Sequence, residues 1–166
     1  MPRQYTMLID QSGKIEEYDS HTGIASSHTS NDIEECISAI FIPQYMKQKL
    51  VGPSTKKLGS KKAFHLKLLS AGIYFVLEDY LPRIGKVVVD REYDNNGPRI
   101  KSHLHNFWLQ HDGKPKSVLP QITFERVHSY GNPPRAHEIA YDVREGNQDA
   151  PSPDFEYLKG MILPSR

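Results

Sequence analysis

Residues 86–90 read Lys-Val-Val-Val-Asp, a β-branched run that ends on a carboxylate. Such a run is typical of a central strand that is covered on both faces, and the aspartate then stands at the carboxyl end of the strand. A second run of strand formers, Tyr5 to Asp10 (YTMLID), also ends on an aspartate. We therefore expect a sheet with helices on both faces and with Asp10 and Asp90 at the ends of two of its strands.

The segments around these two strands predict the remaining elements. Further strands are expected at 14–18, 36–42 and 121–128, where strand-forming residues lie between turn signals. Apolar residues at intervals of three and four predict helices at 61–81, 99–110 and 136–143. Residues 44–60 are polar and broken by Gly52, Pro53 and Gly59, which predicts a loop, or a short helix followed by a loop.

The order of these elements is three strands, helix, strand, helix, strand, helix. Three strands joined by short turns form an antiparallel meander, whereas strands reached through helices join in parallel by right-handed crossovers. We therefore expect an α/β fold with a ribonuclease H-like mixed sheet, in which the first three strands are antiparallel and the last two are parallel. Residues 1–146 form this domain, and the proline-rich tail 147–166 packs on it.

Composition excludes several classes of protein. The 166 residues are 37% hydrophobic and 25% charged, which predicts one domain with its own core. No apolar run approaches the roughly 18 residues of a membrane span, and the N-terminus has no signal-like stretch. A single cysteine, Cys36, forms no internal disulfide. We expect a cytoplasmic protein with no membrane partner.

Charge is segregated along the chain. The formal net charge of +1 predicts neither nucleic acid nor membrane as a partner, but seven lysines and no acid lie between Glu35 and Glu78. One interpretation is a solvated lysine loop. The other is a surface that follows phosphates beside a carboxylate cluster, because lysines neutralise phosphates without reading base sequence. In that case the nucleic-acid backbone is held by Lys56, Lys57, Lys61 and Lys62.

The carboxylates predict a metal site. In the expected sheet Asp10 and Asp90 lie side by side, and two such carboxylates repel each other unless a cation lies between them. Oxygen ligands suit Mg²⁺ or Mn²⁺ better than zinc. Glu92, two residues beyond Asp90, is a further or substitute ligand. On the last expected helix, Asp142 lies nearer the apolar stripe than Glu138 and is better placed to face the site.

Three short motifs resemble those of a known family. Residues 9–13 (IDQSG) resemble the I-D-E-S-G opening of the DUF3800 proteins, a ribonuclease H-like family, and residues 87–91 (VVVDR) resemble its fourth-strand aspartate followed by a basic residue. Residues 142–146 (DVREG) are similar to its A-D-x-x-x-G ending, although Gln11 stands where an acid is usual and Tyr141 where a small residue is usual. The resemblance implies a metal-dependent nuclease or phosphoryl-transfer fold with Asp10, Asp90 and Asp142 as the acidic triad.

The chemistry expected of such a triad is two-metal hydrolysis of a phosphodiester bond in RNA, an RNA–DNA hybrid or structured DNA. His137 is a candidate proton shuttle; its alternative role is a local hydrogen bond. A function of another class remains open: a catalytically inactive ribonuclease H-like module that binds nucleic acid or a protein partner, which Gln11 favours. The two interpretations differ in their dependence on metal.

Overall fold

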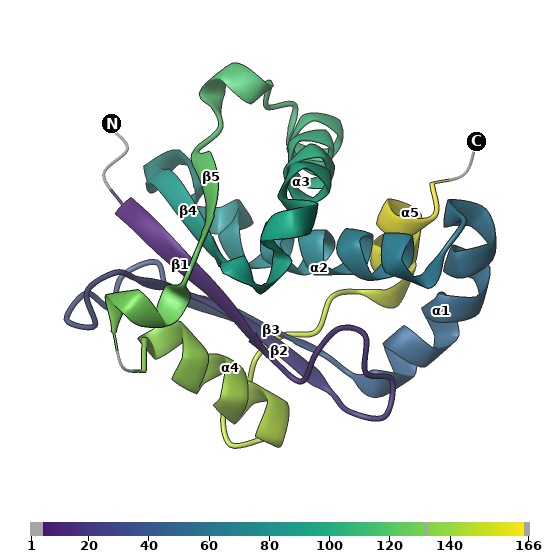
Figure 1. Ribbon diagram of the computed structural model, residues 1–166, viewed down its shortest axis with the longest axis horizontal. Helices are drawn as coiled ribbons and strands as arrows, with labels where there is room; N and C mark the ends of the chain where they lie inside the picture. The colour runs from purple at the N-terminus through teal and green to yellow at the C-terminus, as the bar shows by residue number, and fades with distance from the viewer. Residues whose placement is uncertain (1–4, 132, 165–166) are drawn as a thin grey trace.

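A single mixed sheet organises the chain (Figure 1). The computed structural model describes residues 5–131 and 133–164, and the side chains of residues 92–94 are outside this description. The strand order is β3-β2-β1-β4-β5, with β1 (Tyr5–Ser12), β2 (Thr22–His28), β3 (Ser38–Ile42), β4 (Ile84–Asp90) and β5 (Gln121–Glu125). The pairs β1–β2 and β2–β3 are antiparallel, whereas β1–β4 and β4–β5 are parallel. The predicted mixed sheet is therefore confirmed.

Helices cover both faces of this sheet (Figure 1). One face carries α2 (Lys61–Leu77) and α3 (Gly97–Asp112), and the other carries α4 (Arg135–Glu145), which crosses β1, β2 and β3. The helices α1 (Gln44–Leu58) and α5 (Phe155–Ile162) pack on α2. Short 3-10 helices complete the fold: η1 (Glu78–Arg83), η2 (Arg91–Asn96), η3 (Lys116–Val118) and η4 (Val127–Tyr130). Within the described residues, no helix has the length and apolarity that crossing a membrane requires.

The valine run of β4 is buried on both faces, as its composition predicts. Val87 and Val89 belong to the main core, which fills the space between the sheet and α2. Val88 points to the other face, where it packs with Leu8 and Val127. The alternation that a half-exposed strand would show is absent because both faces carry apolar cover.

The second strand lies later in the sequence than predicted. Residues 14–18 form a turn, in which Glu17 N donates to Lys14 O at 3.0 Å, and the strand is instead β2, buried at all seven positions. Its sequence, TGIASSH, is small and polar because α4 packs closely on it: a Cβ added at Gly23 would lie 2.3 Å from the carbonyl oxygen of Ala140. Because the backbone of α4 lies so close to β2, this strand has small residues instead of the β-branched residues that usually indicate a strand.

Residues 44–58, expected to contain at most a short helix, form the 15-residue helix α1 with Pro53 inside it. The helix buries Met46, Lys47, Leu50 and Ser54 on one side. Residues at intervals of four form one stripe along a helix, and this stripe packs against α2 and α5. Tertiary packing thus outweighs the local cost of glycine and proline.

The tail contributes to the core. In α5, Leu158, Met161 and Ile162 are buried in the main cluster. Before this helix, Phe41 N donates a 2.9 Å hydrogen bond to Pro151 O, so the tail lies along the outer edge of β3. The segment 147–164 therefore lies along the edge strand β3 and packs on α2 through α5.

Candidate metal centre

Asp10 stands at the centre of a polar group at the end of β1. Its side chain is 8% exposed. Oδ1 accepts a 2.9 Å hydrogen bond from the backbone N–H of Gln11, and Oδ2 lies 3.0 Å from Nδ1 of His137. Burial raises the pKa of Asp10 above its ordinary value, while the hydrogen bond with His137 acts in the opposite direction. A buried carboxylate of this kind gains from a cationic partner.

Two imidazoles meet this carboxylate. His128 Nε2 lies 3.8 Å from Asp10 Oδ2, and the rings of His128 and His137 are edge to face with centroids 4.7 Å apart. One ligand atom from each of the three residues lies within 4.8 Å of the other two. Both histidine side chains are more than 40% exposed, so the group is open to solvent on the side away from Asp10.

The histidine of η4 is positioned by contacts on either side of it. Val127 is fully buried against Leu8 and Val88. Tyr130 Oη donates a 2.5 Å hydrogen bond to Glu125, the last residue of β5. Glu125 also receives bonds from Thr123 and Lys86, and these three hydrogen bonds hold its pKa at about 2. The carboxylate is thus a fixed acceptor to which η4 is attached.

The histidine of α4 is positioned by the start of that helix. Ala136 N donates a 2.9 Å hydrogen bond to Ser27 Oγ of β2, and Arg135 pairs with Glu34 at 2.9 Å. Ala136 itself is fully buried against Ala25. The first turn of α4 is therefore fixed on the sheet, and His137 projects from it toward the end of β1.

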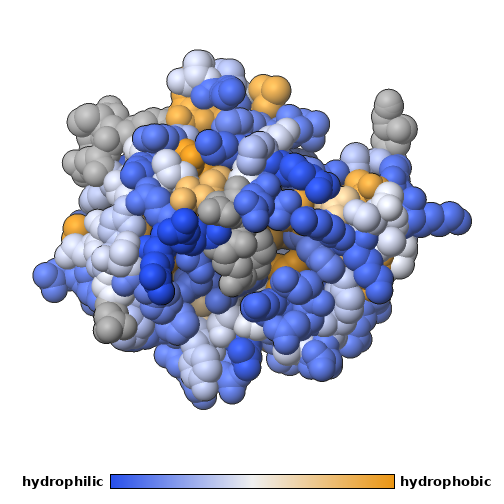
Figure 2. Space-filling model, viewed as in Figure 1, coloured by the Kyte–Doolittle hydropathy of each residue, from blue (hydrophilic) through white to orange (hydrophobic). Residues whose placement is uncertain are grey.

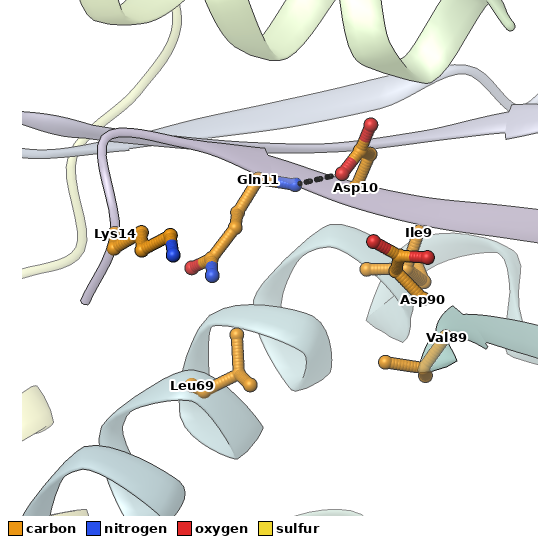
Figure 3. A pocket seen from close by; sticks show the side chains of 7 residues that line it. All are labelled: Ile9, Asp10, Gln11, Lys14, Leu69, Val89 and Asp90. Carbon is orange, nitrogen blue, oxygen red and sulfur yellow. Dashed lines mark hydrogen bonds between the residues drawn. The ribbon is translucent and has the colours of Figure 1, made fainter. Parts of the chain in front are cut away.

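Asp90 lies at the end of the neighbouring parallel strand. Asp10 and Asp90 line one pocket with Ile9, Gln11, Lys14, Leu69 and Val89 (Figure 3). The charge of Asp90 contributes to the raised pKa of Asp10, and Asp90 Oδ1 lies 3.5 Å from the backbone N–H of Val127. The two strand-end carboxylates thus share a pocket, as their strand positions predict, but Asp90 is not among the three residues whose ligand atoms meet.

Asp142 lies on the outward part of α4, in a hollow that it shares with His137, Glu138 and Tyr141. Five residues correspond to about 140° around a helix axis, so Asp142 and His137 project in different directions. His137 is the residue of α4 that reaches Asp10. The structure therefore does not bring Asp142 into the group, and its role as a ligand remains a prediction. The side chain of Glu92 lies outside the described residues.

The four lysines predicted to hold nucleic acid are exposed where α1 ends and α2 begins. Lys57 Nζ donates to Pro164 O at 2.9 Å. Lys62 lines a hollow together with Lys14, and Lys14 also lines the pocket of the two aspartates. Of the four lysines, Lys62 thus shares a hollow with a residue of the aspartate pocket. Figure 2 shows one face of the molecule, whose surface is largely hydrophilic with small, separate apolar spots.

The donor set of Asp10, His128 and His137 fits a metal ion. Metal–ligand bonds of about 2.1 Å at angles near 90–110° place neighbouring ligand atoms about 3.0–3.5 Å apart. The distances from Asp10 Oδ2 to the two imidazole nitrogens, 3.0 Å and 3.8 Å, lie at or close to this range. The group could therefore hold a divalent ion with one oxygen and two nitrogen donors.

Sequence reasoning missed His128 altogether. The sequence predicts a strand over 121–128 that ends at this residue, but β5 stops at Glu125 and the chain turns into η4. The available signal was Ser129-Tyr130-Gly131 directly after it, a turn-forming sequence that shortens the strand. His137 was identified, though as a proton shuttle or a local hydrogen-bond partner rather than as a ligand.

Comparison of the chain with protein-family models, with curated proteins and with solved structures found no match. The functional interpretation therefore depends on the geometry of the site.

Proposed function

We propose that this chain is a cytoplasmic nuclease with a ribonuclease H-like fold, which hydrolyses phosphodiester bonds with a divalent metal ion. The observation that carries the proposal is the meeting of the Asp10 carboxylate with the imidazoles of His128 and His137, beside Asp90 at the end of the adjacent parallel strand. The strand order and the resemblance to DUF3800 proteins support the same proposal. RNA, RNA–DNA hybrids and structured DNA are the proposed substrates.

Each residue of the site has a separate role in the proposed reaction. Asp10, His128 and His137 would hold the ion, and Asp90 faces the shared pocket from β4. A divalent ion supplies Lewis-acid stabilisation of a phosphoryl oxygen and activation of water. Lys14, which lines the pocket, offers an ammonium group to a phosphate that enters it. The half-exposed imidazoles leave room for the substrate on the solvent side.

The imidazoles also bear on which ion is bound. Carboxylates suit Mg²⁺, Ca²⁺ and Mn²⁺, whereas imidazole suits transition metals. A site with two nitrogen donors and one oxygen donor favours Mn²⁺ over Mg²⁺, the two ions that the carboxylate triad alone left open. We therefore propose Mn²⁺ as the functional ion of the pair.

A Mn²⁺ titration followed by electron paramagnetic resonance tests the site directly. We expect the wild type to bind Mn²⁺ with electron-spin-echo modulation from imidazole nitrogen, and Asp10→Asn to bind at least tenfold more weakly, since a ligand is lost. Asp149→Asn, which removes an exposed carboxylate near the end of α4, is the matched control and should bind as the wild type does. Binding without nitrogen modulation would refute the histidine ligands.

The activity is tested on labelled single-stranded RNA, hybrid, duplex and junction substrates with the same three proteins. We expect the wild type and Asp149→Asn to cleave at least one substrate in Mn²⁺, and Asp10→Asn to cleave none. If all three proteins bind nucleic acid equally, independently of metal, and none cleaves it, the enzyme proposal is wrong and the inactive binding module takes its place.

A further inference from the structure

Another polar hollow lies at the start of β5, whereas the metal centre lies beyond the end of this strand, where η4 begins. The hollow is lined by Lys101 and His105 of α3, by Lys116 of η3 and by residues 120–123 at the start of β5. β5 pairs only with β4, so the hollow borders an open edge of the sheet within the part of the chain that the structure describes. Its polar lining therefore faces solvent rather than another strand.

The charge of this hollow is uncompensated. Among its lining residues there is no acid, whereas each of four other hollows, including that of the two aspartates, has at least one. No ion pair joins Lys101 or Lys116 to a carboxylate among the residues described. Burial and then the charges of Lys116 and Lys101 lower the pKa of His105, so the imidazole is itself close to both ammonium groups.

We propose that this cationic hollow binds a phosphate group. Two ammonium groups and an imidazole supply several N–H donors and positive charge, which is what phosphate oxygens accept. An anion there would relieve the mutual repulsion of the Lys101 and Lys116 ammonium groups.

The position of the hollow suggests the source of the phosphate. β5 runs from the hollow at Ile122 to Glu125, from which η4 carries His128 to the metal centre. Three residues of strand and three more through η4 to His128 span at most about 16 Å, a length that a few nucleotides can bridge. On the basis of the proposed nuclease function, the hollow would hold a backbone phosphate of the strand being cut. The alternative source is a free phosphate or a nucleotide.

The binding step is tested without metal and without cleavage. Inorganic phosphate is titrated at low salt while the ring signals of His105 and the amide signals of residues 121–123 are followed by NMR. We expect saturable shifts in the wild type and at least tenfold weaker binding in Lys101→Gln/Lys116→Gln, because two charged donors are removed. The double variant Lys49→Gln/Lys159→Gln removes the same charge from exposed sites on α1 and α5 and should behave as the wild type does. Equal phosphate binding by all three proteins would overturn the proposal.

Binding of a fluorescein-labelled single-stranded RNA in the presence of EDTA distinguishes a backbone phosphate from a free phosphate or a nucleotide. For a backbone phosphate, the slope of log K against log salt should be about 1 less steep in Lys101→Gln/Lys116→Gln than in the control. An unchanged slope together with lost phosphate binding would overturn the backbone assignment and leave a free phosphate or a nucleotide as ligand. Asp10→Asn is expected to bind inorganic phosphate normally, so failure of the nuclease proposal is distinguishable from failure of this site.

Discussion

Lys47 is a fully buried lysine whose ammonium group fastens the segment between the first two strands. Its Nζ donates to the carbonyl oxygens of Lys14 and Glu17 and to Thr22 Oγ1, the last at 2.9 Å. The turn that it holds carries Lys14, which lines the pocket of Asp10 and Asp90. A single side chain of α1 therefore supports one wall of the candidate site.

Replacing Lys47 with methionine should destabilise the protein by about 1–3 kcal/mol, because three acceptors lose their donor. Burial lowers the pKa of Lys47 to about 8, from an ordinary value of 10.5. Between pH 8 and pH 10.5 the unfolded chain therefore holds more protons at this residue than the folded protein does, and its contribution to stability rises with pH. Urea unfolding at pH 7.5 and pH 10 measures both effects.

The control is Lys56→Met, which removes an exposed lysine from the same helix. It should leave the free energy of unfolding within about 0.5 kcal/mol of the wild type. If the stability gap between the wild type and Lys47→Met narrows from pH 7.5 to pH 10, the assigned pKa shift has the wrong sign.

Of the candidate site, the sequence predicts only the two residues that end strands, Asp10 and Asp90. Asp10 and Asp90 each end a recognisable strand, and the parallel pairing of those strands brings them to one pocket. His128 depends on a 3-10 turn, and His137 depends on the angle at which α4 crosses the sheet. Neither is encoded by a periodic pattern, because both follow from tertiary contacts between segments distant in sequence.

Among the elements, α4 and β2 form the closest contact relevant to the site. Gly23 faces the backbone of Ala140, and the helix carries His137 three residues earlier. Two flat, small-residue surfaces allow the helix backbone to approach the strand directly. The distance between His137 and Asp10 therefore depends on the absence of a side chain at position 23.

Gly23→Ala should displace α4 and destabilise the protein by about 1–3 kcal/mol, since the new Cβ would lie 2.3 Å from a carbonyl oxygen that cannot rotate away. Mn²⁺ affinity should fall as well, because His137 moves relative to Asp10. Thermal unfolding and Mn²⁺ titration measure the two effects. Gly160→Ala is the control: its Cβ meets open space within α5, so it should stabilise by up to about 1 kcal/mol with unchanged Mn²⁺ affinity. Wild-type Mn²⁺ affinity in Gly23→Ala would contradict this account.

The elements whose own sequence has a periodic or β-branched pattern could be predicted from it. Periodic apolar residues identified the positions of α2, α3 and α4, and the β-branched run identified β4. Apart from the ends of strands, such as that of β5, the errors fell on β2 and α1, whose local sequences are small-residue and glycine–proline rich respectively. In both, the deciding interaction is packing against another element, which overrides local propensity.

At the scale of the whole molecule, the tail belongs to the same cooperative unit as the sheet. Leu158 is 1% exposed and lies in the main core cluster with residues of α2. The chain that leads to it is hydrogen bonded to the edge strand β3. A segment packed in this way should unfold together with the rest of the protein rather than before it.

Leu158→Ala should lower the free energy of unfolding by about 2–4 kcal/mol in a single transition, because it leaves a cavity in the common core. Leu109→Ala makes the same chemical change at a side chain that is 54% exposed and should cost less than about 0.5 kcal/mol. Urea unfolding followed by both fluorescence and circular dichroism measures the effect. Two separate transitions in the Leu158 variant would show that the tail is an independent unit.

The edge-to-face pair of half-exposed imidazoles also governs how the protein behaves during purification. Two neighbouring histidines open to solvent should retain the untagged chain on an immobilised nickel resin at neutral pH, with release by free imidazole. Nickel leached from the resin binds nitrogen donors more tightly than manganese does. Material prepared in this way would carry nickel at Asp10, His128 and His137, and a chelator wash followed by desalting would have to precede any measurement of manganese affinity.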